Sequence, residues 1–183
     1  MRNDWLLPLL LLAFGTLSAQ VEWHPYAGLV TGDRAVTLTE PDDALTTYTG
    51  DRLLVGADLL FGGRSLAPLV GVAYQPNTYV TRDGDRSFAY HHLQLPLGVA
   101  YRLLPADLDL NLLLTAAIAP GLRLGDKDTE TVLLDDKAIA WMGRGGIVLC
   151  IYSATLGVQY RHQLNTGLPQ RSGAWALTAG LRF

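Results

Sequence analysis

The sequence has 183 residues, of which 49% are hydrophobic and 17% charged, and its formal net charge is −3. This length suits one domain, and the apolar content excludes an intrinsically disordered chain. The slightly acidic balance gives no electrostatic case for a nucleic-acid partner, and the single cysteine, Cys150, excludes an intrachain disulfide and a cysteine-rich metal site.

Residues 1–19 have the pattern of a secretory signal peptide. Arg2 gives a short positively charged start, an apolar stretch covers residues 5–14, and small residues follow up to Ala19. The apolar stretch contains a proline and is too short for a spanning helix. We therefore expect cleavage after Ala19, an exported protein, and one mature domain over residues 20–183.

The mature chain alternates apolar and polar residues with a period of two, which is typical of β-strands. The alternation is strongest in four segments, at 91–103, 108–124, 151–161 and 173–183. Weaker alternation predicts four further strands, at about 21–31, 52–61, 66–76 and 138–149. No segment shows the 3.6-residue period of a long amphipathic helix.

The connections between the predicted strands alternate in length. Three are short: 62–65, 104–107, and a tight reversal near Cys150 and Ile151. The others are long and polar, at 31–50, 77–87, 125–137 and 163–172. Short turns at one end and long loops at the other predict an all-β fold, an eight-stranded antiparallel up-and-down β-barrel.

Alternation alone does not say whether the apolar face lines a core or contacts lipid. A soluble eight-stranded barrel places apolar residues inside, whereas a membrane barrel places them outside. The polar face here consists mostly of small residues with occasional charges, which suits a narrow lumen. Tyr152 and Tyr160 lie eight residues apart near strand ends, as expected for two interfacial aromatic girdles. The pattern predicts a transmembrane barrel with periplasmic termini, and a soluble barrel is the alternative.

Four segments together resemble a known family: "HHLQLPLGVAYRL", "LLLTAAIAPGLRLGD", "GRGGIVL" with "LGVQYRHQLNTG", and "WALTAGLRF". They are similar to the PorT-like outer-membrane β-barrel family of Bacteroidetes, over about residues 21–183. The order of glycine and proline at 119–121 departs from the family pattern. The resemblance implies a small outer-membrane barrel, in some members a part of protein secretion or assembly. It also implies that the insertion machinery recognises a terminal aromatic strand, here ending at Phe183.

No arrangement of residues predicts an enzyme, a cofactor site or a metal site. A hydrolytic barrel needs a Ser–His–acid or Asp–His group near the outer leaflet. His162 and Ser172 flank the last loop, and His91 and His92 begin the fourth strand, but no spacing joins them into a triad. Adjacent strand residues point to opposite faces, so the His91–His92 pair cannot chelate a metal from one strand. We expect interfacial histidines, with His91 and His162 on the lipid side.

Alternation places several charged residues in the predicted lumen. Toward the periplasmic end fall Glu22, Asp58, Arg102, Asp109 and Arg182; toward the outer end fall Arg52, Arg123 and Arg161, with Arg144 between the groups. Two interpretations stay open: a polar plug of paired charges, and an arginine-lined outer vestibule that receives anionic groups. Because side chains fill an eight-stranded lumen, a general diffusion pore is disfavoured.

The predicted loop at 125–137 is strongly acidic and carries Asp126, Asp128, Glu130, Asp135 and Asp136. It lacks the central glycine and the twelfth-position acid of a calcium loop, so we expect a solvated loop. A divalent-cation bridge from this loop to lipopolysaccharide is a hypothesis.

The sequence therefore predicts a non-enzymatic outer-membrane protein that is structural or binds partners through its loops or wall. The expected partners are outer-membrane lipids and lipopolysaccharide, the barrel-assembly machinery through Phe183, and envelope proteins of a secretion or assembly complex. The alternatives are a porin-like conduit for small solutes or lipophiles and, less favoured, an outer-membrane lipid hydrolase.

Overall fold

The computed structural model describes residues 21–31, 35–39, 45–50, 53–62, 65–81, 87–105, 108–125, 139–164 and 173–183. The predicted signal peptide lies outside the described residues. No described helix is long and apolar enough to cross a membrane. The described strands are β1 (Val21–Thr31), β2 (Ala35–Thr39), β3 (Leu45–Gly50), β4 (Leu53–Phe61), β5 (Leu66–Thr81), β6 (Ser87–Gln94), β7 (Leu97–Arg102), β8 (Leu110–Gly125), β9 (Ile139–Ile151), β10 (Ala154–Gln163) and β11 (Gly173–Leu181).

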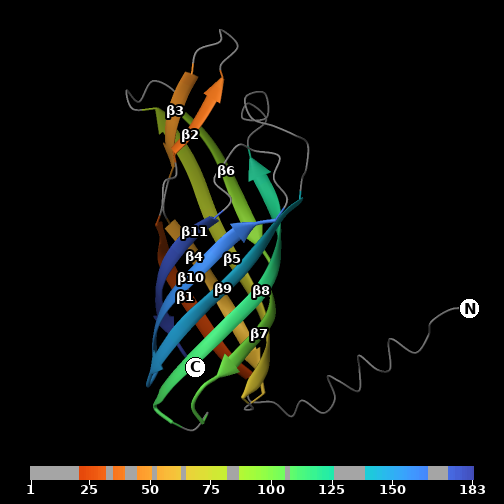
Figure 1. Ribbon diagram of the computed structural model, residues 1–183, viewed down its shortest axis with the longest axis vertical. Helices are drawn as coiled ribbons and strands as arrows, with labels where there is room; N and C mark the ends of the chain where they lie inside the picture. The colour runs from red at the N-terminus through yellow and green to blue at the C-terminus, as the bar shows by residue number, and fades with distance from the viewer. Residues whose placement is uncertain are drawn as a thin grey trace, which may run out of the picture.

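These strands form one antiparallel sheet that closes into an eight-stranded barrel (Figure 1). Around the ring β5 pairs with β4, and the order continues through β1, β11, β10, β9 and β8. The eighth position, between β8 and β5, is shared by β6 and β7. The predicted fold class, an eight-stranded antiparallel barrel, is confirmed.

A proline explains why one predicted strand is divided into β6 and β7. Pro96 has no N–H to donate, so it interrupts the hydrogen-bond ladder between the two pieces. Two backbone bonds nevertheless hold this break in the wall: Gly71 N–H donates to the Pro96 carbonyl at 2.8 Å, and Leu95 N–H donates to the Pro120 carbonyl at 2.9 Å. The predicted strand at 91–103 therefore occupies a single position in the ring.

Two strands were not predicted. β2 and β3 lie within the segment expected to be a polar loop, and β3 pairs with the end of β5 from Tyr48↔Thr81 to Gly50↔Tyr79. Both strands are rich in threonine and other residues that favour extended backbone. The β2–β3 hairpin extends beyond the barrel at the end opposite the C-terminus (Figure 1). We call these two ends the hairpin end and the C-terminal end.

The tight reversal between β9 and β10 lies one to two residues later than predicted. Ile151 is still in β9 and pairs with Ala154, so the turn consists of Tyr152 and Ser153. Tyr152 has a φ of 52°, and among the described residues it is the one other than glycine whose φ is positive. The prediction that Tyr152 belongs to a strand was wrong, because this conformation belongs to a turn.

The barrel closes between its first and last strands. β1 and β11 pair from Tyr26↔Gly180 to Thr31↔Trp175. Beyond β11, Trp23 N–H donates to the Phe183 carbonyl at 3.1 Å, and Phe183 N–H donates to the Trp23 carbonyl at 3.0 Å. The two rings also lie 5.9 Å apart between centroids. The seam is therefore paired to the last residue of the sequence.

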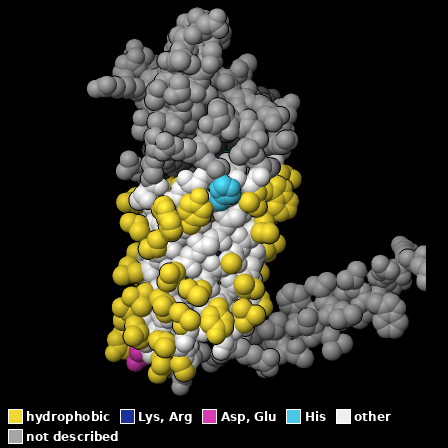
Figure 2. Space-filling view, in the orientation of Figure 1, with side chains coloured by type: hydrophobic (Ala, Val, Ile, Leu, Met, Phe, Trp, Pro, Cys, Tyr) yellow, Lys and Arg dark blue, Asp and Glu magenta, His cyan; other side chains and the backbone are white. Residues whose placement is uncertain are grey.

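The two faces of the wall differ in polarity in the sense predicted for a membrane barrel. Along β10, Leu156, Val158 and Tyr160 are exposed on the outside, whereas Thr155, Gln159 and Arg161 are buried inside. On the face drawn in Figure 2, the outward side chains of the described barrel are mostly apolar, and none of them is a lysine or arginine. The arrangement is the reverse of a soluble barrel, whose apolar residues point inward.

Small residues on the inner wall give the lumen its space. Gly56 lies beside Tyr26, and a Cβ there would come within 2.6 Å of the tyrosine ring. At Gly71 an added Cβ would collide with Oδ1 of Asp58. Because Gly56 and Gly71 have no side chain, the side chains of Tyr26 and Asp58 are able to lie directly against the barrel wall. Some of the 19 glycines in the sequence thus serve lumen packing.

Candidate functional site

The lumen is crossed by three groups of buried polar side chains, which together form the candidate site. Along β4, Leu60, Asp58 and Leu54 follow one another on the inner face. Leu60 belongs to an apolar cluster with Leu69 and Leu113, and Leu54 belongs to a second cluster with Val30 and Ala176. The polar group around Asp58 therefore lies between two apolar layers.

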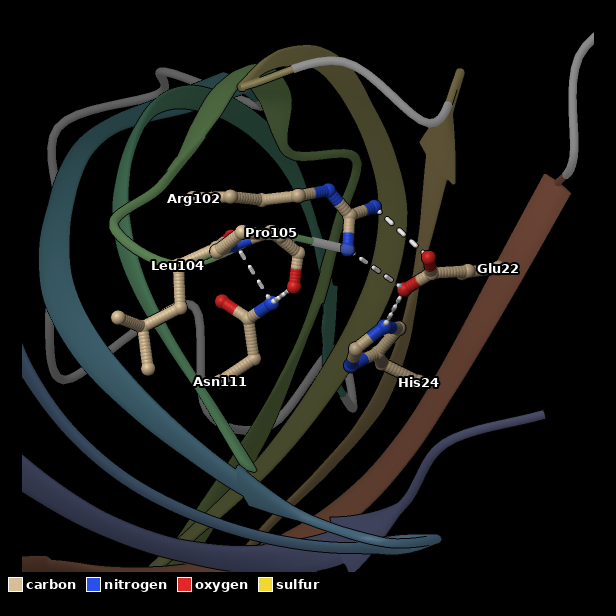
Figure 3. Close-up of polar contacts among 6 residues, drawn as sticks. All are labelled: Glu22, His24, Arg102, Leu104, Pro105 and Asn111. Carbon is tan, nitrogen blue, oxygen red and sulfur yellow. Dashed lines mark hydrogen bonds and ion pairs between the residues drawn. The ribbon is translucent and has the colours of Figure 1, made fainter. Parts of the chain in front are cut away.

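The first group lies toward the C-terminal end and joins β1 to β7 (Figure 3). Arg102 Nη1 donates to Glu22 Oε2 at 3.1 Å, and its Nη2 lies 2.9 Å from Oε1. His24 Nε2 lies 3.2 Å from the same Glu22 Oε2. The Arg102 side chain is almost fully buried, so its charge needs this carboxylate. The pairing of acids and arginines predicted at this end is confirmed for Glu22 and Arg102.

Near this group a buried amide holds the turn between β7 and β8. Asn111 Nδ2 donates to the Leu104 carbonyl at 3.2 Å and to the Pro105 carbonyl at 3.0 Å (Figure 3). Asn111 lies in the alternating segment 108–124, and sequence analysis gave it no role. The sequence signal for this role is an Asn in an alternating strand segment shortly after Pro105. Asn111 is fully buried in the structure, and a buried amide needs hydrogen-bond partners.

The prediction that Asp109 points into the lumen was wrong. β8 begins at Leu110, so Asp109 lies in a bend, where strand alternation does not apply, and its side chain is exposed. Its backbone carbonyl accepts a hydrogen bond from Tyr152 N–H at 2.6 Å. Arg182 is half-buried, as expected near the C-terminal end, and its backbone N–H donates to the Ser153 carbonyl at 2.6 Å.

The second group joins β1, β4 and β9 in the middle of the lumen. Arg144 Nη2 donates to Asp58 Oδ2 at 2.9 Å, and Arg144 Nη1 donates to the Tyr26 hydroxyl at 3.0 Å. Asp58 and Arg144 are 8% and 5% exposed, so this is a buried ion pair. Sequence analysis identified both charges as inward but did not predict that they pair.

The third group lies toward the hairpin end and joins β5, β6 and β10. Arg161 Nη1 donates to Gln75 Oε1 at 2.9 Å, and Arg161 Nη2 donates to Gln94 Oε1. Arg161 lies directly opposite Arg144 in the β10–β9 register. Like charges opposite one another repel, and here the two guanidinium groups are turned to different partners.

The arginine vestibule predicted at the outer end is only partly described. Arg161 is 4% exposed and is bound by two glutamine side chains, so it contributes to the packed interior. Arg52 and the side chain of Arg123 lie outside the described residues, as do the acidic residues at 126–137. Of the two interpretations, the polar plug is the one that the described contacts match.

Two of the three histidines considered for catalysis, His91 and His162, contact outward-facing tyrosines. Tyr74 and His91 stack with centroids 5.6 Å apart, and the Tyr74 hydroxyl lies 2.8 Å from His91 Nδ1. His162 stacks on Tyr160 at 6.3 Å. Ser172 lies outside the described residues. Within the described part of the chain, no group of three or more His, Cys, Asp or Glu residues could hold a metal ion.

Comparisons with known proteins add a fold likeness. No protein-family model and no curated protein matches the chain. Among solved structures, the chain is similar to Ail, the attachment invasion locus protein of Yersinia pestis. The two share 13% sequence identity with a TM-score of 0.47, and the match covers 90% of this chain and 99% of that one.

Proposed function

We propose that this protein is a non-enzymatic outer-membrane β-barrel whose lumen is plugged, so that it acts through its outer wall and its loops. The observation that carries the proposal is the inverted polarity of the barrel, with an apolar exterior and buried charges inside. In hydrocarbon every backbone N–H and C=O must be paired, and a closed barrel satisfies that requirement. We place the hairpin end outside the cell and both termini in the periplasm.

The packed lumen supports a plug rather than a conduit. A water-filled passage would expose the polar side chains that line it, but Gln94, Arg102, Arg144 and Arg161 are at most 5% exposed. These residues belong to all three polar groups, so each level of the lumen is occupied by side chains. An eight-stranded interior is just wide enough to be filled in this way.

The test is conductance of the purified mature protein in planar lipid bilayers. We expect no discrete channel openings, while a general porin reconstituted in the same lipid, as the positive control, shows them. Regular single-channel steps from this protein would contradict the plug and favour the small-solute conduit. The lipid hydrolase alternative is tested separately: deleting the gene should leave the lipid A mass spectrum unchanged, and altered acylation would favour hydrolysis.

A role in a secretion or assembly complex is the more specific form of the proposal, and the PorT-like segments of the sequence support it. The barrel should then co-purify with fixed envelope proteins after cross-linking in native membranes. A variant lacking most of the acidic segment 126–137 provides the matched comparison, because it retains all the residues of the described strands. Recovery of the wild-type barrel alone would instead support a free-standing protein.

Deleting Phe183 should impair membrane assembly more than it impairs the finished barrel. We propose that the assembly machinery binds the strand that ends there. Deletion also removes the two Trp23–Phe183 backbone bonds, worth about 1 kcal/mol each. The measurements are the membrane fraction of heat-modifiable protein in cells and the unfolding midpoint after refolding in detergent. Phe183→Ala keeps the backbone bonds and isolates the ring; wild-type membrane levels for both variants would refute recognition through Phe183.

A further inference from the structure

Two histidines on the outer wall, His91 and His162, are the basic side chains described on that surface at the hairpin end. His91 pairs with Leu124, one residue before β8 ends at Gly125, and His162 pairs with Gly173, the first residue of β11. Among the outward side chains that the structure describes at this end, none is a lysine or an arginine. An anion that approached this part of the wall would therefore meet imidazoles.

The first histidine is held in place by a tyrosine, and we call these two residues the Tyr74–His91 pair. Their rings stack with centroids 5.6 Å apart, and the Tyr74 hydroxyl lies 2.8 Å from His91 Nδ1. The hydrogen bond at one ring nitrogen of a histidine determines which nitrogen carries the proton. With the Tyr74 hydroxyl donating to Nδ1, the proton lies on Nε2, whose N–H is then able to donate to a group outside the pair.

The second histidine stacks on Tyr160, and we call these two residues the Tyr160–His162 pair. The two ring centroids are 6.3 Å apart, and the Trp175 ring holds Tyr160 on another side at 5.1 Å. A Cβ at Gly173 would collide with the Tyr160 hydroxyl, so this hydroxyl lies against the backbone of Gly173. Because Gly173 is directly opposite His162, the phenol and the imidazole offer their donors to the same part of the wall.

The two pairs lie on opposite sides of the barrel. On one side of the ring, β8 and β9 separate β6 from β10, and on the other side β4 and β1 separate β5 from β11. Tyr74 and His91 belong to β5 and β6, whereas Tyr160 and Trp175 belong to β10 and β11. A single lipid headgroup is therefore unable to reach both pairs, and each pair faces a different molecule.

Apolar side chains continue the wall from each pair toward the C-terminal end. Leu93 and Leu95 follow His91, and Val158 and Leu156 precede Tyr160 on β10. A phosphate that carries acyl chains would place those chains along these residues, whereas a dissolved phosphate ion would gain nothing from them. The combination of donors at the strand end and an apolar wall beside them fits the headgroup of a lipid.

We propose that each tyrosine–histidine pair binds a phosphate group of lipid A, the membrane anchor of lipopolysaccharide. The imidazole N–H donates to a phosphate oxygen, and a hydrogen bond to an ionised acceptor is stronger than a neutral one. Tyr74 is a positioning residue, because its hydroxyl acts through His91, whereas the Tyr160 hydroxyl is a second donor. This inference rests on the proposed function, which places the hairpin end outside the cell.

The test is native mass spectrometry of the mature protein in detergent, titrated with phosphorylated lipid A and, separately, with lipid A of the same acyl chains after removal of its phosphates. We expect one bound lipid A at each pair, and binding of the phosphorylated form on the order of tenfold tighter. Equal binding of the two forms would overturn the proposal, because the wall would then hold acyl chains alone. Displacement of lipid A by inorganic phosphate at equal concentration would overturn it as well, because the acyl chains would then contribute nothing.

Three variants test the imidazoles. His91→Phe and His162→Phe keep an aromatic ring but remove the N–H donor, so each should lose the preference for phosphate at one pair. Leu122→Phe is the matched control, because Leu122 is an exposed outward residue of β8 that pairs with Leu93 and has no donor to lose. The control should keep the wild-type preference, and an equal loss in the control would refute the role of the histidines.

Tyr74→Phe tests the positioning role separately. The variant keeps the ring that stacks on His91 and removes only the hydroxyl. We expect weaker binding of phosphorylated lipid A at this pair alone, together with a changed ratio of the two His91 tautomers in nitrogen NMR spectra of the lipid-free protein. An unchanged tautomer ratio would show that the hydroxyl does not orient the imidazole, and would refute the positioning role.

A further measurement distinguishes failure of this inference from failure of the proposed function. Thr37→Cys places a thiol in β2, and a membrane-impermeant maleimide should label it in intact cells. Labelling of intact cells without a phosphate preference in detergent would refute the lipid A sites and leave the proposed function in place. Labelling only after the outer membrane is permeabilised would refute the placement of the hairpin end, and the lipid A sites with it.

Discussion

Replacing Leu114 with arginine should destabilise the barrel by about 2–4 kcal/mol in a lipid bilayer, which is the cost of a cation on the lipid-facing side near the midplane. Leu114 is 39% exposed on the outside of β8, where it pairs with Tyr101 on one side and Ile147 on the other. Denaturant unfolding of the protein refolded into vesicles measures the change in free energy.

Thr115→Arg is the matched control for this prediction. Thr115 is the next residue of β8 and faces the lumen, so arginine there acts through crowding of packed side chains and not through lipid. The cost at Leu114 should therefore fall when vesicles are replaced by detergent micelles, whereas the cost at Thr115 should not. Equal responses of the two variants to this exchange would contradict the assignment of inner and outer faces.

Replacing Asp58 with leucine should cost about 3–5 kcal/mol, because it leaves the Arg144 guanidinium buried without its counter-charge. Among the described residues, the Tyr26 hydroxyl would be the remaining hydrogen-bond partner of that guanidinium, and a neutral hydroxyl does not compensate a full charge. Arg144→Met should cost less, since the remaining carboxyl group can bind a proton whereas a guanidinium cannot lose one. Unfolding free energies at neutral pH measure both effects.

The double variant D58L/R144M separates the charge from the packing. Removing both partners of a buried ion pair is often nearly neutral, because the desolvation cost disappears together with the attraction. We expect the double variant to be more stable than Asp58→Leu alone. If the two single costs simply add, the 2.9 Å contact contributes no coupling, and the central pair is not what holds this part of the lumen.

Much of the barrel was predictable because one property, alternation, determines both the strands and their two faces. The outward positions of β10 and β11 and the inward Thr155, Gln159 and Thr178 follow directly from it. The β2–β3 hairpin was missed because its strands are only five and six residues long and lie within a segment whose other residues are mostly polar. The Tyr152 turn was misplaced because apolar residues continue through it.

The partners within the lumen were less predictable than the residues themselves. Arg144 and Asp58 are 86 residues apart, as are Arg161 and Gln75, and contact follows from the strand register around the ring. Alternation gives the face of a residue but not its height relative to a distant strand. Gln75, Gln94 and His24 were overlooked for a related reason: sequence analysis followed charges, whereas the lumen also uses neutral side chains.

The Trp23–Phe183 seam has a consequence for the order of events in folding. Its two ends are separated by nearly the whole described chain, so the ring cannot close until the last strand has arrived. Contacts between such distant segments form slowly, because the conformational entropy of the intervening chain is lost before the pairing contributes any stability. Until then β1 presents an unpaired edge, which is the feature that promotes aggregation. The time during which this edge stays open, more than the stability of the finished ring, should set how strongly the chain depends on holding chaperones before insertion.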